Sequence, residues 1–271
     1  MTSHTLAVPG ARLYYEARGA GPTLLLIPGG PADAGGFAGL AAALAARYTV
    51  VAYDPRDNSR STADAPHDLD MAVYADDAAA VISAVGNGPA YVFGSSGGGQ
   101  IGLALAARHP ARLRAVLAHE PPCIELLPDA AEQRAFFDRV VETFHARGVA
   151  PAIAMFMQGA GLAAPSPPAG PGAMTPELAA VLGRMAKNFA FFLPHGLKPI
   201  SLFVPDVAAL RAGSVSIAIG VGAESAGQLA HRTALALAAQ LGVTPVRFPG
   251  DHAGYGPHAA AFADALHRAL V

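Results

Sequence analysis

Short apolar runs and helical stretches alternate along most of this chain, and this order restricts the fold more than any other feature of the sequence. The runs are bounded by Gly, Pro or polar residues and predict buried strands, whereas the longer stretches between them carry helical periodicity. Strand–helix–strand units pair their strands in parallel through right-handed crossovers. The sequence therefore predicts an α/β fold, a mostly parallel sheet with helices on both faces. The expected strands are Leu6–Val8, Arg12–Glu16, Thr23–Ile27, Thr49–Tyr53, Ala90–Phe93, Leu113–Ala118, Ser214–Ile219 and Thr244–Phe248, and the expected helices are Phe37–Arg47, Met71–Val85, Gly97–Arg108, Gly227–Leu241 and His258–Leu270.

The alternation is interrupted in the middle of the chain, where helical patterns occur without a convincing strand. The helices expected there are Ala130–Arg147, Ala150–Met157 and Pro176–Phe192, and the segment Ala163–Ala173, rich in Pro and Gly, predicts a mobile loop. A helical excursion between two strands is typical of a lid over the edge of a sheet. We therefore expect one α/β core domain, residues 1–122 and 200–271, with residues 123–199 inserted in it as a helical lid (cap).

Composition excludes several classes of protein. Of the 271 residues, 52% are hydrophobic and 14% are charged, which predicts a large core rather than disorder. The net charge of −2 offers no basic field for nucleic acid, and no apolar run approaches the roughly 18 residues of a membrane helix. The single cysteine, Cys123, excludes an intramolecular disulfide, and no His, Asp or Glu cluster has metal-ligand spacing, so we expect neither a metal nor a cofactor. No targeting segment is visible, so a cytoplasmic location is expected, whereas the oligomeric state stays open.

A Gly-x-Ser-x-Gly motif follows the strand expected at Ala90–Phe93 and opens the next helix. A serine nucleophile at a sharp strand-to-helix turn stands clear of the sheet, and small neighbours at Gly94 and Gly98 relieve the crowding of that turn. The helix N-terminus offers free N–H groups to a developing oxyanion. The motif therefore predicts that Ser96 is a nucleophile. A turn that only packs is one alternative. A phosphate-binding loop is a second alternative, and it is disfavoured because no Lys or Arg follows in either loop.

A serine nucleophile needs a base, and His252 is the best placed of the ten histidines. It follows the last expected strand between glycines, at the edge of the sheet where Ser96 also lies. The acid is Glu120 or Glu224, because each follows a strand at the edge where functional groups collect in an open α/β sheet. The residues alone do not decide between these two carboxylates. His119, beside Glu120, is expected either to be structural or to support the catalytic side chains without touching the substrate.

The loop after the first parallel strand, Pro28–Pro31, is expected to complete an oxyanion hole. Its glycines let the backbone approach a ligand closely, whereas Pro31 has no N–H to donate. The predicted donors are therefore the backbone amides of Gly30 and Gly97, one from each loop.

At these residues the sequence resembles the α/β-hydrolase fold family over nearly the whole chain. The resemblance rests on the loop Ile27–Gly30, the turn Asp54–Ser61, the elbow around Ser96 and the loop that carries His252. More narrowly, the chain is similar to the zearalenone lactone hydrolases and related bacterial hydrolases. That subgroup carries its triad acid in a His-Glu-x-Pro segment, so the resemblance implies that Glu120 is the acid.

The resemblance extends to the expected lid, where Lys187–Phe189 leads into an aromatic pair. It implies a substrate-binding role for Phe192, which stands where the subgroup has a tryptophan, because this chain contains no Trp. A second departure is Asp57, at a position where many members of the family have glycine.

Together these features predict a serine-dependent hydrolase of a carboxylic ester or lactone that acts through an acyl-enzyme. The many Phe and Met residues of the expected lid predict a small-molecule substrate that is large and apolar or aromatic. The resemblance implies a zearalenone-type resorcylic macrolactone. Two alternatives remain: a cofactor-free lyase or oxygenase on the same fold, in which Ser96 only hydrogen-bonds the substrate and His252 is a base, and a non-catalytic ligand receptor.

Overall fold

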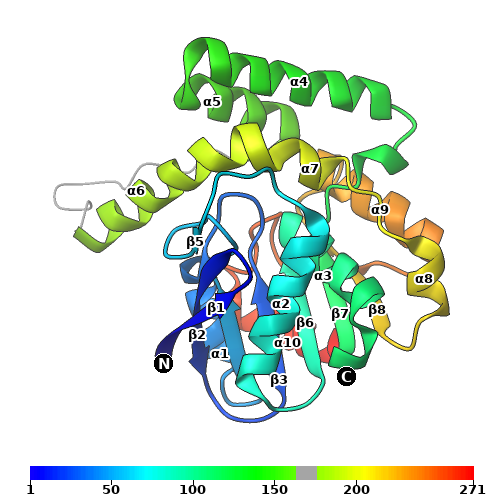
Figure 1. Cartoon of the computed structure of the whole chain (residues 1–271). Coiled ribbons are helices and arrows are strands. Elements are labelled where there is room, and N and C mark those ends of the chain that lie inside the picture. Colours follow the sequence, from blue (N-terminus) through cyan, green and yellow to red (C-terminus); the bar gives the residue numbers. More distant parts are fainter. Residues whose placement is uncertain (163–175) are drawn as a thin grey trace.

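The α/β fold predicted from the alternation is confirmed in the computed structural model, which describes residues 1–162 and 176–271 (Figure 1). The strands are β1 (Thr2–Val8), β2 (Ala11–Arg18), β3 (Thr23–Ile27), β4 (Thr49–Tyr53), β5 (Thr62–Ala63), β6 (Ala90–Ser95), β7 (Leu113–His119), β8 (Ser216–Gly222) and β9 (Val246–Phe248). The α-helices are α1 (Ala38–Leu44), α2 (Met71–Val85), α3 (Gly97–Arg108), α4 (Ala130–Arg147), α5 (Val149–Ala160), α6 (Pro176–Phe191), α7 (Leu197–Ser201), α8 (Val207–Ala212), α9 (Leu229–Leu241) and α10 (Ala259–Leu270).

The strands form one sheet in the order β1-β2-β4-β3-β6-β7-β8-β9, with β5 paired to β2 beside this path. The β1–β2 and β2–β4 pairs are antiparallel, and the pairs from β4 through β9 are parallel. Ile27 pairs with Gly94, and Ser95 pairs with His119, so β3, β6 and β7 end at the same edge of the sheet. The loops that carry the predicted site residues therefore meet at this edge.

Helices cover both faces of the sheet, and each face has its own apolar core. Helices α1 and α10 pack on one face, where Phe37 and Phe262 enclose Phe93. Helices α2, α3 and α9 pack on the other face, over residues such as Leu25 and Val92 that are fully buried. No helix in the described ranges combines the length and the apolar character needed to cross a bilayer.

Helices α4 to α7 lie above the edge of the sheet where the loops meet (Figure 1). We refer to the described residues between 123 and 199 as the helical insertion. A single turn of π-helix, Phe192–Gly196, joins α6 to α7 and was not predicted from the sequence. The loop predicted at Ala163–Ala173 lies outside the described residues.

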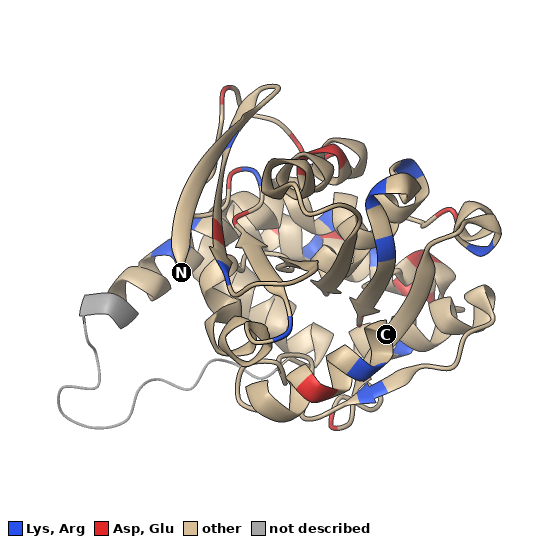
Figure 2. Cartoon of the chain, turned by 90° about the horizontal axis from the view of Figure 1, so that it is seen from below, with Lys and Arg blue, Asp and Glu red and all other residues tan. Residues whose placement is uncertain are grey.

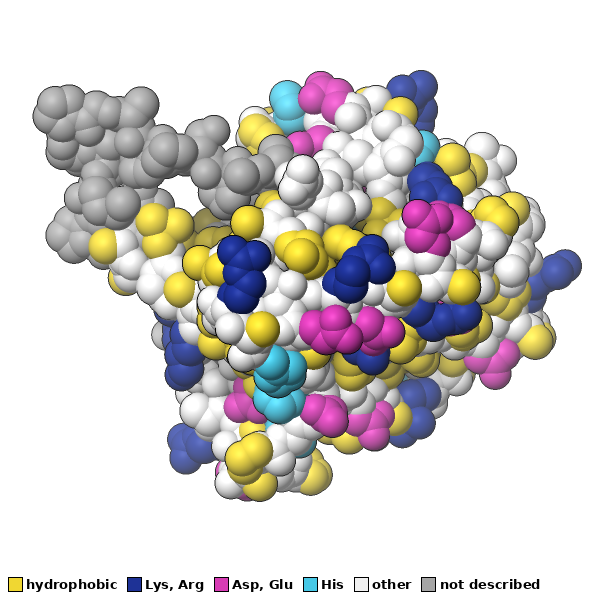
Figure 3. Space-filling model, turned by 90° about the horizontal axis from the view of Figure 1, so that it is seen from above, with side chains coloured by type: hydrophobic (Ala, Val, Ile, Leu, Met, Phe, Trp, Pro, Cys, Tyr) yellow, Lys and Arg dark blue, Asp and Glu magenta, His cyan; other side chains and the backbone are white. Residues whose placement is uncertain are grey.

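The surface of the helical insertion carries apolar side chains between charged ones, as the view from above shows (Figure 3). On α6, Val181 and Leu182 are exposed, whereas Asn188 and Phe189 are buried. This helix therefore turns one face toward the core and the other toward solvent.

Lys, Arg, Asp and Glu residues are interspersed around the outer helices and loops (Figure 2). Arg56 and Asp77 are instead both buried, and Nε and Nη2 of Arg56 donate to the two carboxylate oxygens at 3.0 and 2.8 Å. Nη2 also donates to the carbonyl of Pro9 at 3.1 Å. The pair ties α2 to the turn that follows β4, which in turn supports the loop after β3.

Replacing Asp77 with alanine is expected to lower the free energy of unfolding by about 3–5 kcal/mol, because the Arg56 guanidinium stays buried without a counter-charge. The neighbouring Asp76→Ala is a matched control on the same helix. Asp76 pairs with Arg108 and His109 at the surface, and exposed pairs contribute about 0–1 kcal/mol. Urea denaturation of both variants measures the difference. Equal losses would contradict a stabilising role of the buried pair.

Candidate active site

Ser96 lies at the turn between β6 and α3, with φ 54° and ψ −122°, a conformation that L-residues rarely adopt. Its N–H donates to the carbonyl of His119 at 2.8 Å, which holds the turn in place. A Cβ at Gly94 would lie 2.2 Å from the carbonyl oxygen of Gly98, and a Cβ at Gly98 would lie 2.0 Å from that of Ile27. Close backbone approach therefore requires both glycines of the motif, as in a nucleophile elbow.

His252, in the loop between β9 and α10, pairs with Glu120, which directly follows β7. Nδ1 of His252 lies 2.7 Å from Oε2 of the buried Glu120. The other oxygen, Oε1, accepts from the N–H of Gly222 at 2.9 Å and from the hydroxyl of Ser225. Burial alone would raise the pKa of Glu120, but the hydrogen bond and charge of His252, together with the Ser225 hydroxyl, lower it to about 2. The ionised carboxylate therefore accepts the Nδ1 proton, which leaves Nε2 of His252 as a base.

Glu224, the alternative acid, is exposed in the loop after β8. Its backbone N–H donates to the carbonyl of Gly250 at 2.9 Å. Within the described chain, its carboxylate forms no ion pair, whereas Glu120 pairs with His252. The fold thus brings Glu120, and not Glu224, to the histidine.

His119 packs behind this pair and does not line the pocket described below. Its ring lies edge-on to the rings of Phe248 and Phe262, at centroid distances of 5.5 and 5.4 Å. The centroid of the His252 ring lies 6.3 Å from that of His119. Burial lowers the pKa of His119 to about 3, so the ring is neutral. Neither ring nitrogen has a hydrogen-bond partner among the residues described. These contacts are those of a packed core side chain, the first of the two roles expected for it.

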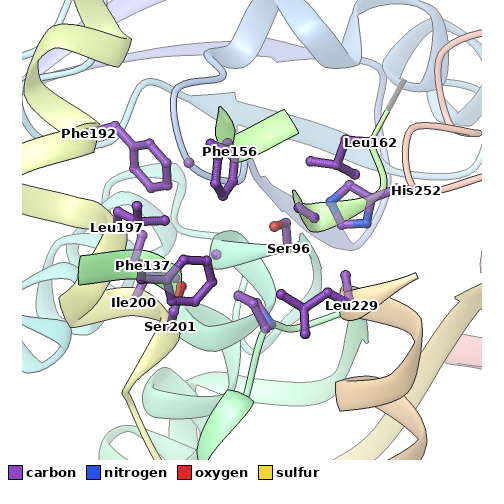
Figure 4. A pocket seen from close by; sticks show the side chains of 15 residues that line it. Ser96, Phe137, Phe156, Leu162, Phe192, Leu197, Ile200, Ser201, Leu229 and His252 are labelled. Atoms are coloured by element: carbon purple, nitrogen blue, oxygen red, sulfur yellow. The ribbon is translucent and has the colours of Figure 1, made fainter. Parts of the chain in front are cut away.

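Ser96 and His252 line one apolar pocket beneath the helical insertion (Figure 4). The space between its walls is about 460 Å³, part of which is open to solvent. Phe137, Phe156 and Phe192 form an aromatic wall, with the last two rings 5.9 Å apart between centroids. Aliphatic side chains complete most of the lining: Ala160, Leu162, Leu197, Ile200, Leu229 and Ala230. Such a lining suits the apolar part of a ligand, and its polar side chains are Ser96, His252 and Ser201.

The backbone amides of Gly30 and Gly97 lie side by side at the Ser96 end of the pocket. A Cβ built on Gly97 would be 3.3 Å from the nitrogen of Gly30, and both glycines line the pocket. Neither N–H finds an acceptor among the residues that the structure describes. Gly30 has φ 48°, and a Cβ there would lie 3.4 Å from the ring of Phe192. Two neighbouring amides without an acceptor in the described chain thus lie at the Ser96 end of the pocket.

The side chains that orient these groups were not predicted from the sequence. Ser225 binds Glu120, and Nδ2 of Asn58 donates to the carbonyls of Gly30 and Ala32 at 2.9 and 3.0 Å. Asn58 lies in a turn that the family resemblance includes, but no local pattern links it to a loop 28 positions earlier.

Other candidate chemistry is limited in the described part of the chain. Across residues 1–162 and 176–271, no three His, Cys, Asp or Glu side chains are arranged to hold a metal ion. Cys123 is buried, and its Sγ donates to Oε1 of Gln100 at 3.3 Å. Burial raises the pKa of this thiol, which keeps it protonated and unreactive.

A nucleophile elbow at the end of β6 and a histidine loop after β9, on a sheet of this order, define a hydrolase of the α/β type. Residues 22–159 match the sequence model of the alpha/beta hydrolase fold, and the chain belongs to this family. It is 33% identical to the uncharacterized hydrolase YraK of Bacillus subtilis (strain 168), a match that covers 98% of this chain and 95% of that protein.

Solved structures show the same fold. An alpha/beta hydrolase from Sphaerobacter thermophilus DSM 20745 is 23% identical with a TM-score of 0.73, over 99% of this chain and 100% of that one. An enol-lactonase from Burkholderia xenovorans LB400 is 20% identical with a TM-score of 0.70, over 98% of this chain and 99% of that one. The predicted family and enzyme class are confirmed, whereas none of these comparisons points to the zearalenone subgroup.

Proposed function

We propose that this hydrolase cleaves carboxylic esters or lactones with a large apolar acyl part, using Ser96 as nucleophile. One observation carries the proposal: the elbow serine, the paired amides of Gly30 and Gly97, and the His252–Glu120 pair converge on one apolar pocket. Acyl transfer needs each of these parts, because the serine must be deprotonated as it attacks and the carbonyl oxygen must be stabilised as it becomes an anion.

In acylation, Oγ of Ser96 attacks the carbonyl carbon while Nε2 of His252 accepts the hydroxyl proton. The amides of Gly30 and Gly97 bind the tetrahedral oxyanion, each contributing about 3 kcal/mol. The C–O bond to the leaving group then breaks, and His252 returns the proton to the leaving alkoxide. Glu120 holds the imidazole in the required tautomer and stabilises its positive charge.

In deacylation, the same groups act on water. His252 accepts a proton from a water molecule, whose oxygen attacks the acyl-enzyme, and the oxyanion again forms at the Gly30 and Gly97 amides. The carboxylate product leaves as Ser96 recovers its proton. With a lactone the leaving hydroxyl stays tethered to the acyl group, so deacylation must outrun reclosure of the ring.

The lining of the pocket indicates which acyl groups the enzyme accepts. Its wall of Phe137, Phe156 and Phe192 favours an aromatic or long aliphatic acyl group. A zearalenone-type resorcylic macrolactone belongs to this class and is the substrate that the family resemblance implies, with Phe192 against the aromatic ring. The solved enol-lactonase shares the fold, and its name places lactones among the chemistries that this scaffold supports.

Turnover of a matched ester panel tests the proposal. We expect p-nitrophenyl 3-phenylpropionate to exceed p-nitrophenyl acetate in kcat/KM by about 10-fold or more, because the extra apolar carbons contact the aromatic wall. Zearalenone and smaller lactones complete the panel, and their hydrolysis is followed by chromatography. A fluorophosphonate is expected to label Ser96, as mapped by peptide mass spectrometry. Labelling at another residue, or no turnover of any ester or lactone, contradicts the proposal.

A further inference from the structure

Three consecutive carbonyls of the loop after β3 accept hydrogen bonds from two buried asparagines. Nδ2 of Asn58 donates to the carbonyls of Gly30 and Ala32 at 2.9 and 3.0 Å, and Nδ2 of Asn188 donates to that of Pro31 at 2.8 Å. Both asparagine side chains are shielded from water, with 4% and 0% of each residue exposed. Buried amides in such a position restrict the peptide planes that they bind.

The two asparagines come from different parts of the chain. Asn58 belongs to the turn after β4 in the core, whereas Asn188 belongs to α6 in the helical insertion. Asn188 also binds that turn. Its Oδ1 accepts a hydrogen bond from the N–H of Ser59 at 2.7 Å, and its Nδ2 donates one to the Ser59 hydroxyl at 2.9 Å. A single side chain of the insertion thus joins the turn and the loop after β3.

A second contact from α6 reaches the same loop. Nε of Arg184 donates to Oδ2 of Asp33 at 2.8 Å, and the hydroxyl of Ser59 donates to the same oxygen at 2.8 Å. Burial alone would raise the pKa of Asp33, but its hydrogen bonds with Arg184 and Ser59 lower it, so the carboxylate is ionised. Helix α6 is therefore attached to the loop at Pro31 and at Asp33.

The three held carbonyls belong to the peptides that directly follow the one carrying the Gly30 N–H. Gly30, with φ 48°, has no side chain to restrict its backbone, so its N–H keeps one direction only if the neighbouring peptides are fixed. That N–H belongs to the Gly29–Gly30 peptide, whose carbonyl accepts a hydrogen bond from the N–H of Ala32 at 3.0 Å. The Ala32 N–H in turn belongs to the Pro31–Ala32 peptide, which Asn188 holds at the Pro31 carbonyl. An amide turned away by a few tens of degrees no longer meets an oxyanion at hydrogen-bonding distance.

We propose that Asn188 is a positioning residue, through which the seating of α6 orients the Gly30 amide of the oxyanion hole. This inference rests on the proposed acyl-transfer function. It means that the insertion does more than cover the substrate: its docking assembles part of the transition-state site. The Gly30 N–H forms a strong hydrogen bond with the substrate oxygen only when that oxygen is charged, in the transition state. A misplaced N–H in a variant without Asn188 therefore lowers kcat rather than raising KM.

The test compares Asn188→Ala, which removes every contact, with Asn188→Asp, which keeps the shape and the acceptor for Ser59 but loses the donor to Pro31. We expect kcat to fall about 10- to 100-fold in both variants, with KM changed less than about 3-fold. The affinity for an arylalkyl boronic acid, whose tetrahedral Ser96 adduct places an oxygen in the oxyanion hole, should fall by the same factor as kcat. The affinity for an uncharged ether analogue of the ester should stay unchanged.

Lys187→Ala is the matched control, because Lys187 precedes Asn188 on α6 and is exposed. It should leave kcat and boronate affinity unchanged. Should the Asn188 variants fail to fold, Arg184→Gln tests the same coupling at Asp33, with a smaller loss of kcat and boronate affinity and an unchanged KM. Unchanged boronate affinity in a folded Asn188 variant, or a loss confined to KM, overturns the inference. A wild-type protein that hydrolyses no ester overturns the proposed function alone, because the boronate comparison still decides the role of Asn188.

Discussion

Replacing Ser96 with alanine is expected to lower kcat/KM for the best ester substrate by about 10⁵-fold while the protein stays folded. The variant lacks the attacking oxygen, so no acyl-enzyme forms, and only substrate binding and the oxyanion amides remain to promote attack by water. Steady-state turnover measures the loss, and fluorophosphonate labelling should disappear with it. Thermal unfolding checks that the elbow between β6 and α3 is intact.

Ser83→Ala is the control for this substitution. Ser83 is exposed on α2, and its hydroxyl donates to the carbonyl of Ala79 at 2.7 Å. The same chemical change there should leave both turnover and labelling unaffected.

Turnover by the Ser96 variant and by the wild-type protein separates the two alternative functions from the proposed one. A cofactor-free lyase or oxygenase that uses His252 as base would keep an appreciable fraction of its turnover without Ser96. A ligand receptor would show stoichiometric binding and no turnover even in the wild-type protein. Either result would contradict a serine-dependent mechanism.

The elements of the core were predictable because their patterns are local. The five residues of β3 are all buried, and they form an uninterrupted apolar run that a central parallel strand requires. The elbow was predictable for the same reason, because its motif is contiguous and a Cβ at Gly94 would meet the backbone of Gly98 only four positions later. In contrast, β5 has two residues and α8 has six, too few to show a period.

The partners of the site residues depend on contacts between distant segments. Glu120 and Glu224 occupy equivalent places in a strand–helix pattern, and the choice between them follows from the register of β7 and β8, which sets Glu120 beside Gly222 and Ser225. Asn188 meets Ser59 across 129 positions of sequence. No periodicity or spacing carries such information, so these residues emerge only from the folded chain.

Glu120→Gln is expected to lower kcat by about 10⁴-fold with little change in KM. The reason lies in the two donors that already bind Oε1, the N–H of Gly222 and the hydroxyl of Ser225. They retain the amide oxygen of the glutamine, so its NH₂ group must face Nδ1 of His252. Nδ1 then accepts a hydrogen bond, and the proton of the neutral imidazole moves to Nε2. A protonated Nε2 can no longer accept the proton of Ser96.

Glu224→Gln is the matched control, because it makes the same change at an exposed carboxylate that the sequence alone ranked as an equal candidate. It should keep kcat within about 2-fold of the wild type, since surface substitutions of this kind perturb their surroundings little. A large loss in the Glu224 variant together with a small loss in the Glu120 variant would show that the loop after β8 rearranges in the working enzyme to supply the acid. Comparable large losses in both would mean that Glu224 supports His252 in addition to Glu120. Only a loss confined to Glu120→Gln fits a histidine whose tautomer is set by one buried carboxylate.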